Sequence, residues 1–550
     1  MFIRVKTSKN SPKRSIQIVE SYRGDNGKVR QRIVRHMGTA LNDREVEKIK
    51  NFAEYVKAEL EPEKSPKLFE PEQLAEMAIE AKRKEQDSQK PLKVDLKNIK
   101  EESRITVGVH EAAGKIYDEL GFNNLLGARK AAASRNLRHI VMARLANPSS
   151  KRSSVADLAR DFGINISVDS VYRMMDAIED KVISKAQEFA YRSASKLLGD
   201  DINLLFYDCT TLYFESFTED DLKKCGYSKD MKFNQPQVVL GLLVTSEGLP
   251  VGYEVFPGNQ FEGGTLQTIL PGILEKYALK RVIFTADSAM LNKENLDYLE
   301  NSSIEYIVAA RLRNLSDKWK SAVTDVSKAD DNIKSFDYGG GRKLIVTYSE
   351  KLAQKNRHDR DTAINKLKKK LDKSSRPDSL ISNYGYKKYL QVTGNSKVRI
   401  DEDKYTADAA FDGLHGVITN VKDLSESEIV DHYRSLWQIE NCFRISKHDL
   451  KIRPVYHWTP KRVRGHILIC FLSLVCIRHL SHRVNLRFET SGLAGSPERM
   501  INALNHIQMS ILHDKKSDAR YLLPSKFSED AEKIYKTLNL KINTTPYKLD

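Results

Sequence analysis

The chain has 550 residues, and its 90 Lys and Arg against 74 Asp and Glu give a formal net charge of +16, which favours an anionic partner such as nucleic acid. A hydrophobic content of 40% is enough for several packed domains, and 27 Gly with 16 Pro are too few for a collagen-like or low-complexity architecture. Five scattered cysteines without a CxxC pair exclude a disulfide framework and are typical of a reducing cytosol.

The sequence predicts no membrane partner. The longest apolar stretch, Ile467–Ile477, is about half as long as the roughly 20 residues that a membrane-spanning helix needs. The N-terminal residues contain no continuous apolar signal core. We therefore expect a cytoplasmic protein in which this stretch is a buried helix.

The first 104 residues are predicted to form a small β unit over 1–40 and a helical connector over 41–104. Alternating apolar and polar residues predict the strands, and Gly24–Gly27 predicts a turn between two of them. Two Glu- and Lys-rich helical patterns follow, and the connector ends in a charged stretch over 87–104.

Residues 105–200 are predicted to be a helical DNA-binding region. The stretch 127–152 carries seven Lys and Arg and no acidic residue. An apolar helix, a turn at Gly163 and a second helix opening at Ser167 or Asp169 then suit a helix-turn-helix. The same pattern also suits an ordinary pair of packed helices.

Residues 201–310 are predicted to be the first part of an α/β catalytic domain. The element order is β-β-β-α-β-α-β, an antiparallel meander that passes into βαβ. The strands are continuous apolar runs, which indicates a mixed sheet with helices on both faces. This order is the ribonuclease H-like pattern.

Two aspartates follow strands of this sheet. Asp208 is expected where the strand Ile202–Tyr207 ends, and Asp287 follows the strand that ends at Ala286. Open α/β sheets generally bind ligands at this edge. Carboxylates that lie close together repel one another unless cations lie between them, and their hard oxygen atoms favour Mg²⁺ or Mn²⁺ over Zn²⁺.

The rest of the chain is predicted to contain an insertion over 311–410, the second part of the catalytic domain over 411–485, and a C-terminal helical region over 486–550. The insertion is charged and contains isolated strands. In the second part of the catalytic domain, a long helix is predicted over roughly 425–450, and it carries residues that could take part in chemistry.

On that long helix, Tyr433, Glu440 and Lys447 are spaced by seven residues. Seven residues are nearly two turns, so all three share one face with roughly 20° of drift per step. Arg444 lies four residues after Glu440 and close to the same face. A solvated charged face would have the same spacing, but apolar residues interleave with these charges, which favours a partly buried helix whose charges need partners.

Basic residues are concentrated around this helix. From Arg434 to Arg464 there are eight Lys and Arg and two acidic residues. Phosphate neutralisation dominates nucleic-acid binding, so this density predicts a track for a nucleic-acid backbone.

The pattern Tyr-x6-Glu-x6-Lys, with Trp-x-Ile-Glu and a following Phe-Arg, resembles the tyrosine–arginine–glutamate–lysine signature of DDE-class insertion-sequence transposases. The segments Ile452–Trp458 and Arg462–His466 resemble that family's continuation, as do Asp208-Cys-Thr-Thr and Ala286-Asp-Ser. The likeness covers roughly residues 200–485. It implies a ribonuclease H-like catalytic domain interrupted by an insertion before the glutamate helix.

The resemblance implies that Asp208, Asp287 and Glu440 form a catalytic triad that holds two divalent ions, Mg²⁺ or Mn²⁺. In the family an arginine follows the tyrosine by three residues, and here that position is Leu436. A tryptophan in the insertion is expected to stack on a flipped DNA base. The residues expected to bind DNA are Tyr433, Arg434, Arg444, Lys447, Arg453 and Trp319.

We therefore expect a DNA transposase that binds insertion-sequence ends and catalyses metal-dependent DNA cleavage and strand transfer. Its partners would be double-stranded DNA, namely the terminal inverted repeats and the target, and a second copy of the chain in a DNA-bound homodimer. The expected location is the nucleoid of a prokaryotic cytoplasm. The alternatives are a metal-dependent ribonuclease H-like nuclease and a non-catalytic DNA-binding regulator.

Overall fold

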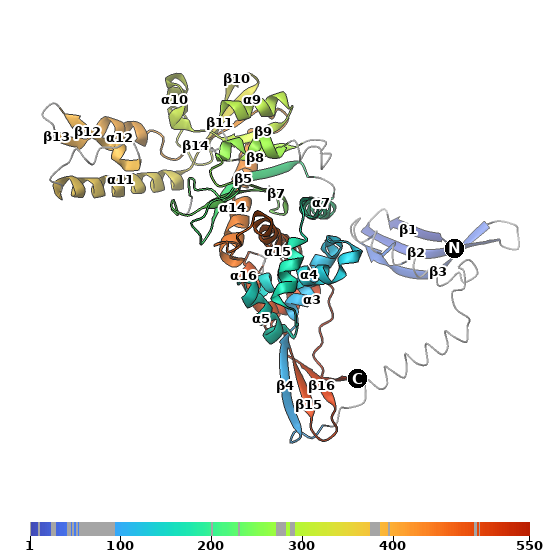
Figure 1. Cartoon of the computed structure of the whole chain (residues 1–550). Helices are drawn as coiled ribbons and strands as arrows, with labels where there is room; N and C mark the ends of the chain where they lie inside the picture. Colours follow the sequence, from blue (N-terminus) through green and yellow to red (C-terminus); the bar gives the residue numbers. More distant parts are fainter. Residues whose placement is uncertain are drawn as a thin grey trace. The chain divides into compact units, whose positions relative to one another are not determined.

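The chain forms two compact units, residues 1–93 and 94–550. The structure is a computed structural model of the whole chain (Figure 1). The residues that it describes are 2–8, 11–23, 29–40, 46, 49–50, 53, 94–199, 202–228, 231–270, 282–286, 292–373, 385–393, 397–488, 492–493 and 495–549.

The first unit contains the predicted β unit. Strands β1 (Phe2–Ser8), β2 (Ser11–Arg23) and β3 (Val29–Ala40) form an antiparallel sheet in the order β1-β2-β3. Ile16 and Ile18 alternate along β2 and are fully buried on one face, which explains the apolar–polar alternation of the sequence. Most of the predicted helical connector lies outside the described residues.

The second unit is built around an eight-stranded mixed sheet in the order β10-β11-β14-β9-β8-β5-β6-β7. The chain passes antiparallel from β5 to β6 to β7 and then runs parallel from β5 to β8 to β9. This is the predicted meander followed by βαβ, and it confirms the ribonuclease H-like α/β class. The strands are β5 (Leu204–Tyr213), β6 (Gln237–Thr245), β7 (Pro250–Pro257), β8 (Ile283–Ala286), β9 (Glu305–Ala309), β10 (Ile333–Gly339), β11 (Arg342–Tyr348) and β14 (Leu414–Thr419).

Strand β5 differs from the prediction at its carboxyl end. The sequence placed Asp208 where the strand stops, but β5 runs five residues further, to Tyr213. Asp208 pairs with Leu242 of β6, and the ladder continues to the pair Tyr213–Gln237. The residues after Asp208 are mostly β-branched or aromatic and pair one by one with residues of β6, so pairing with a strand further along the chain extends β5.

Helices cover both faces of the main sheet. One face is buried under helices α13 (Glu426–Arg434), α14 (Trp437–Arg444) and α15 (Pro460–Arg487), and the other contacts α9 (Lys293–Asn301), so the sheet separates two hydrophobic cores. Helix α15 (Pro460–Arg487) contains the predicted apolar stretch. It is long and apolar enough to cross a membrane, but 94% of its most apolar window is buried inside the protein, as predicted for a core helix.

Residues 108–197 form the predicted helical region. Ser150 and Ser167 cap α5 and α6 by accepting hydrogen bonds from the backbone N–H groups of Ser153 and Ser170, both at 3.1 Å. Gly163 ends α5 with a φ of 66°, a conformation that favours glycine. The two-helix pattern is therefore confirmed. The helices are α3 (Gly108–Glu119), α4 (Ala131–Ala146), α5 (Lys151–Phe162), α6 (Val168–Asp176) and α7 (Asp180–Leu197).

The predicted insertion over 311–410 contains two strands of the main sheet, since β10 and β11 extend that sheet beyond β14. Helix α11, strands β12 and β13, and helix α12 form a separate lobe beside the sheet (Figure 1). Arg360 and Asp412 join this lobe to the sheet through two buried hydrogen bonds of 2.6 and 2.7 Å. The lobe contains α11 (Glu350–Lys373), β12 (Leu390–Thr393), β13 (Lys397–Ile400) and α12 (Glu402–Ala409).

The C-terminal region was predicted to be helical, and this is only partly correct. Strand β15 pairs with β4, a strand within the predicted charged connector, so about 400 residues of chain separate the two partners. Two helices of this region pack onto α15 and α3. The elements are β4 (Ile99–Thr106), α16 (Pro497–Asn505), β15 (Gln508–Asp514), β16 (Arg520–Pro524), α17 (Glu529–Thr537) and β17 (Tyr547–Leu549).

Candidate active site

The predicted long helix over 425–450 is broken into three parts. Helix α13 (Glu426–Arg434) ends one residue after Tyr433, helix α14 (Trp437–Arg444) carries Glu440, and a π-helical turn (Ile445–Asp449) carries Lys447. Since both intervals of seven residues cross a change in helix geometry, the predicted common face of a single helix is wrong. Whether the side chains of Tyr433, Glu440 and Lys447 lie close together therefore depends on tertiary packing.

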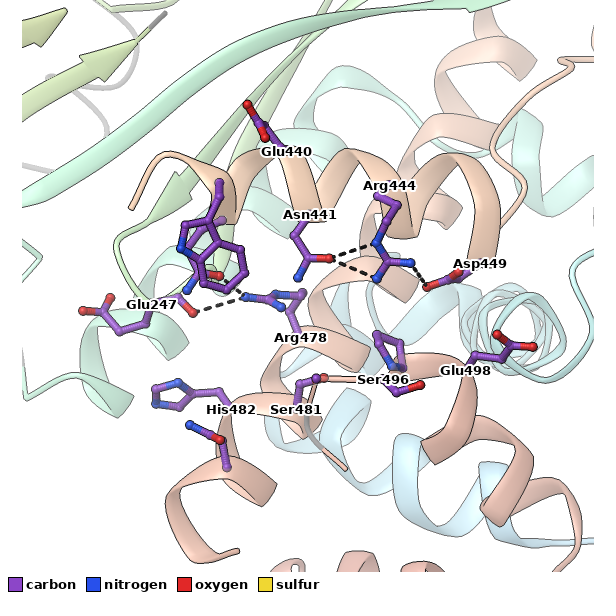
Figure 2. A pocket seen from close by; sticks show the side chains of 15 residues that line it. Glu247, Glu440, Asn441, Arg444, Asp449, Arg478, Ser481, His482, Ser496 and Glu498 are labelled. Carbon is purple, nitrogen blue, oxygen red and sulfur yellow. Dashed lines mark hydrogen bonds and ion pairs between the residues drawn. The ribbon is translucent and has the colours of Figure 1, made fainter. Parts of the chain in front are cut away.

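Helix α14 carries Glu440 and packs over strands β5 and β6 of the main sheet. Ile439, Cys442 and Phe443 are buried in the core and hold α14 against β5 and β6. Glu440 itself is exposed. Figure 2 shows Glu440 on the opposite side of α14 from Asn441 and Arg444.

Asp208 lies on the sheet face that α14 covers. Along β5, Phe206 and Leu212 belong to the core shared with α14, whereas Tyr207 and Cys209 belong to the core on the other face. Side chains alternate along a strand, so Asp208 points to the side of Phe206 and Leu212. Its Oδ1 accepts a hydrogen bond of 2.7 Å from the backbone N–H of Cys209.

The third predicted acid, Asp287, lies outside the described residues. Strand β8, which directly precedes it, ends at Ala286 and pairs Thr285 with Phe206 in the parallel direction. Among the described residues no three His, Cys, Asp or Glu side chains gather into a metal-binding group. The Cys209 thiol is buried on the opposite face. Asp208 and Glu440 each offer carboxylate oxygen atoms, which are the ligands that Mg²⁺ and Mn²⁺ favour.

Two cavities meet at α14, and Trp437 and Glu440 line both of them. The smaller cavity, of about 380 Å³, also contains Tyr433, Arg434 and His415 in its wall. The Tyr433 and His415 rings stack at 4.9 Å, and burial lowers the pKa of His415, with Arg434 adding to the effect. The aromatic part of this wall, at His415, is therefore neutral near pH 7, and the charged groups beside it are Arg434 and Glu440.

The larger cavity, of about 870 Å³, contains Arg444 in its wall (Figure 2). The Arg444 guanidinium donates to Asn441 Oδ1 at 3.0 and 3.2 Å and forms an ion pair with Asp449 at 3.5 Å. Burial raises the pKa of Asp449, and Arg444 opposes that rise. Arg444 is half exposed, so its charge reaches both the cavity and solvent.

Sequence analysis did not identify Arg478 as part of this site. Arg478 is only 8% exposed in the middle of α15 and donates to Gly248 O at 2.7 Å and to Gln438 Oε1 at 2.8 Å. These bonds connect α15, the turn after β6 and α14. An arginine at the end of an otherwise apolar helical run was the available signal, because a buried cation needs partners.

The remaining predicted DNA-binding residues lie in different places. Arg434 is half exposed and 3.4 Å from Asp431, and Lys447 is half-buried. The Arg453 guanidinium lies 5.7 Å from the ring centre of Tyr213, and burial lowers its pKa.

Trp319 lies on α10 (Asp317–Thr324) and contacts Phe336 and Tyr338 at the core on the sheet face opposite α14. The Trp319 and Tyr338 ring centres are 5.1 Å apart. This is the packing expected of an ordinary half-buried tryptophan, and base stacking by Trp319 stays a prediction.

Two protein families match this chain. Residues 200–476, half of the chain, match the family described as transposase DDE domain, and residues 3–67 match the N-terminal domain of the IS1634 family transposases. No curated protein matches. Among solved structures, the piggyBac transposase synaptic complex with hairpin DNA is 10% identical with a TM-score of 0.38, covering 72% of this chain and 76% of its own. The Mos1 transposase paired-end complex with left transposon end is 14% identical with a TM-score of 0.15, covering 29% and 53%.

Proposed function

This chain belongs to the transposase DDE domain family, and from that premise we propose that Asp208, Asp287 and Glu440 are the carboxylates at which it cuts and joins DNA. The protein is a DNA transposase of the insertion-sequence type, an enzyme that catalyses strand cleavage and strand transfer. Family members use divalent metal ions. The triad, the kind of ion and the number of ions are our proposals.

One observation carries the assignment of residues. Helix α14, which bears Glu440, packs on β5 and β6 over the same sheet face to which Asp208 points. These residues are more than 230 positions apart in the chain, so only the fold relates them. Asp287 follows β8, the parallel neighbour of β5, and this supports its inclusion.

The donor set is consistent with Mg²⁺ or Mn²⁺. Asp208, Asp287 and Glu440 would hold two ions through carboxylate oxygens. When bound, such ions activate a water molecule or a DNA 3′-hydroxyl and stabilise the leaving oxygen of an in-line displacement at phosphorus. The role of the protein chain itself is to hold the carboxylates in place and to bind the DNA strand.

We propose that Tyr433, Arg434 and Arg444 contact the DNA next to the carboxylates, because they line the two cavities at whose junction Glu440 stands. Lys447 and Arg453 would bind the backbone further along. The substrate would be the terminal repeats and target DNA, bound by a homodimer at the nucleoid of a prokaryotic cytoplasm.

The test is a cleavage assay on duplexes that carry the terminal repeats bracketing the gene, with and without Mg²⁺. Asp208→Asn and Glu440→Gln should each lower the cleavage rate by more than about 100-fold, because each removes a ligand from ions that supply several kcal/mol of transition-state stabilisation. Binding of the uncut duplex should change little.

The matched control is Glu294→Gln, an exposed carboxylate on α9 at the opposite sheet face, which should cleave at the unchanged rate. Full Mg²⁺-dependent cleavage by Asp208→Asn or by Glu440→Gln would remove that residue from the proposed site.

A further inference from the structure

A third cavity, of about 350 Å³, is lined on its charged side by cations alone. It lies between the start of α5 and the loop 451–457, and we call it the cationic cavity. Among the described residues, no aspartate or glutamate lines it. Its charged lining residues are Arg144, Lys151, Arg152, Lys451 and Arg453.

Two of these cations are buried. Arg144 is 4% exposed and Lys151 is 3% exposed. In the part of the chain that the structure describes, neither forms an ion pair with a carboxylate, and the Arg144 Nε atom has no hydrogen-bond partner. Burying an uncompensated cation costs several kcal/mol, so the fold maintains positive charge here at the expense of stability.

The neighbours of Lys151 do not compensate its charge. The Lys151 ammonium contacts His466 Nδ1 at 3.2 Å, while His466 Nε2 lies 2.9 Å from the carbonyl oxygen of Ile452. Since a carbonyl only accepts, Nε2 carries the proton and Nδ1 accepts from Lys151. Burial lowers the pKa of His466 well below its ordinary value, so this ring is neutral. Among the residues that the structure describes, the charge of Lys151 therefore has no anionic counterpart.

The backbone adds to the positive electrostatic potential in the cationic cavity. Ser149 and Ser150 line the cavity directly before the 12-residue helix α5, of which Ser150 is the N-cap, and the N-terminus of this helix carries the positive end of the helix dipole. Helix N-termini with nearby cations are common sites for phosphate groups. Arg144, with its unpartnered Nε, is a separate indication of a missing anion.

The cavity is connected to the strand that carries Asp208. The backbone N–H of Val455 donates to Tyr213 O at 3.0 Å, and Arg453 lies over the Tyr213 ring. Tyr213 is the last residue of β5, five residues beyond Asp208. Five residues of extended strand span roughly 17 Å, which is the length of about five nucleotides of a DNA strand.

We propose that the cationic cavity binds one backbone phosphate of the DNA strand, a few nucleotides from the phosphate that is cut. This proposal rests on the transposase function and adds a second anchor point to it. The anchor fixes the register of the strand relative to the carboxylates and does not touch the reacting atoms, so Arg144 and Lys151 are positioning residues.

The decisive variant is Lys151→Met, which replaces the buried ammonium by an apolar side chain of similar length. We expect affinity for a terminal-repeat duplex to fall roughly three- to tenfold, and the slope of log affinity against log salt to fall by about one, because one phosphate contact is lost. The melting temperature should stay unchanged or rise, since the variant removes an uncompensated charge. A merely structural lysine would lower it.

Lys536→Met is the matched control, because Lys536 is a half-exposed lysine of α17 that pairs with Glu532 and does not line the cavity. It should keep the wild-type salt slope. Wild-type affinity and slope in Lys151→Met would overturn the proposal. If Lys151→Met does not fold, Lys451→Gln, at the exposed rim of the cavity, provides the same test. We expect it to lower the slope of log affinity against log salt. An unchanged slope would contradict the proposed anchor.

Inorganic phosphate separates a free anion from a DNA phosphate. The melting temperatures of wild type and Lys151→Met are compared in phosphate and in chloride at equal ionic strength. If phosphate stabilises only the wild type while Lys151→Met binds duplex normally, the site belongs to a free anion and the DNA anchor is wrong. Loss of cleavage in Asp208→Asn together with normal DNA binding by Lys151→Met would refute this anchor alone and leave the proposed catalytic site standing.

Discussion

At the scale of single residues, Leu436 and Lys151 are two buried positions, one with an apolar side chain and one with an ionisable side chain. Leu436, which stands where the resembling family has an arginine, is 7% exposed and packs in the core with Ile439 and Phe443. An apolar side chain suits this buried position. Lys151 is the opposite case, an ionisable side chain in a buried position.

Lys151 predicts a pH dependence of stability. Burial, with a smaller contribution from Arg144, lowers the pKa of Lys151 to about 7. Between pH 7 and about pH 10 the unfolded chain holds a proton on this side chain that the folded chain releases, so the free energy of unfolding rises with pH. In urea unfolding at pH 7, 8, 9 and 10, the stability of the wild type relative to Lys151→Met should increase with pH. Parallel pH profiles would contradict a lowered pKa.

At the scale of elements, the orientation of α14 decides where Glu440 stands. The helix is short, and it is connected to its surroundings by the apolar face that contains Ile439 and Phe443 and by the Gln438–Arg478 hydrogen bond. Arg478 also reaches Gly248 O, so one guanidinium links α14, α15 and the turn after β6. A Cβ at Gly248 would overlap with the Arg478 guanidinium, and this explains why a glycine with a φ of 79° occupies that turn.

Removing this link should affect both stability and cleavage. Arg478→Met leaves a buried carbonyl and the Gln438 side chain without their donor, so we expect a loss of about 2–4 kcal/mol in the free energy of unfolding. The cleavage rate at saturating DNA and Mg²⁺ should fall while duplex binding persists, because Glu440 loses its fixed position. Arg487→Met, at an exposed position on the same helix, should cost less than about 1 kcal/mol and should not alter cleavage. An equal effect of both substitutions would refute the positioning role of Arg478.

At the scale of the whole molecule, the C-terminal region completes the second unit. Ile534 and Tyr535 of α17 are fully buried in the large core, and the Tyr535 hydroxyl donates to Glu111 at 2.6 Å. Strand β15 supplies the neighbour of β4. Residues near the end of the chain thus stabilise helices near the start of this unit.

Truncation tests this dependence. Deleting residues 508–550 removes the partner of β4 and two large side chains of the core, so the shortened chain should lose the cooperative thermal transition of the second unit in circular dichroism. Deleting only residues 547–550, at the edge of the sheet, should shift the melting temperature by a few degrees at most. An unchanged transition after the longer deletion would show that this region is not part of the cooperative unit.

Local signals in the sequence determined much of this protein. Alternation along β2, the capped helices α5 and α6, the apolar helix α15 and the strand order from β5 to β9 follow from residues close together in the chain. The prediction that Asp208 and Glu440 are catalytic rests on sequence surroundings that resemble a known family. Such features depend on propensity, capping and periodicity, which act over a few residues.

Only the tertiary structure decided how far β5 runs past Asp208, where the helix around Glu440 breaks, that β10 and β11 join the main sheet, and that β15 pairs with β4. It also decided which members of a basic stretch are buried, as Lys151 and Arg144 are. Strand pairing and burial depend on neighbours that lie hundreds of residues away, and the free energy of a charge depends on what surrounds it in space, so neither can be read from a local pattern.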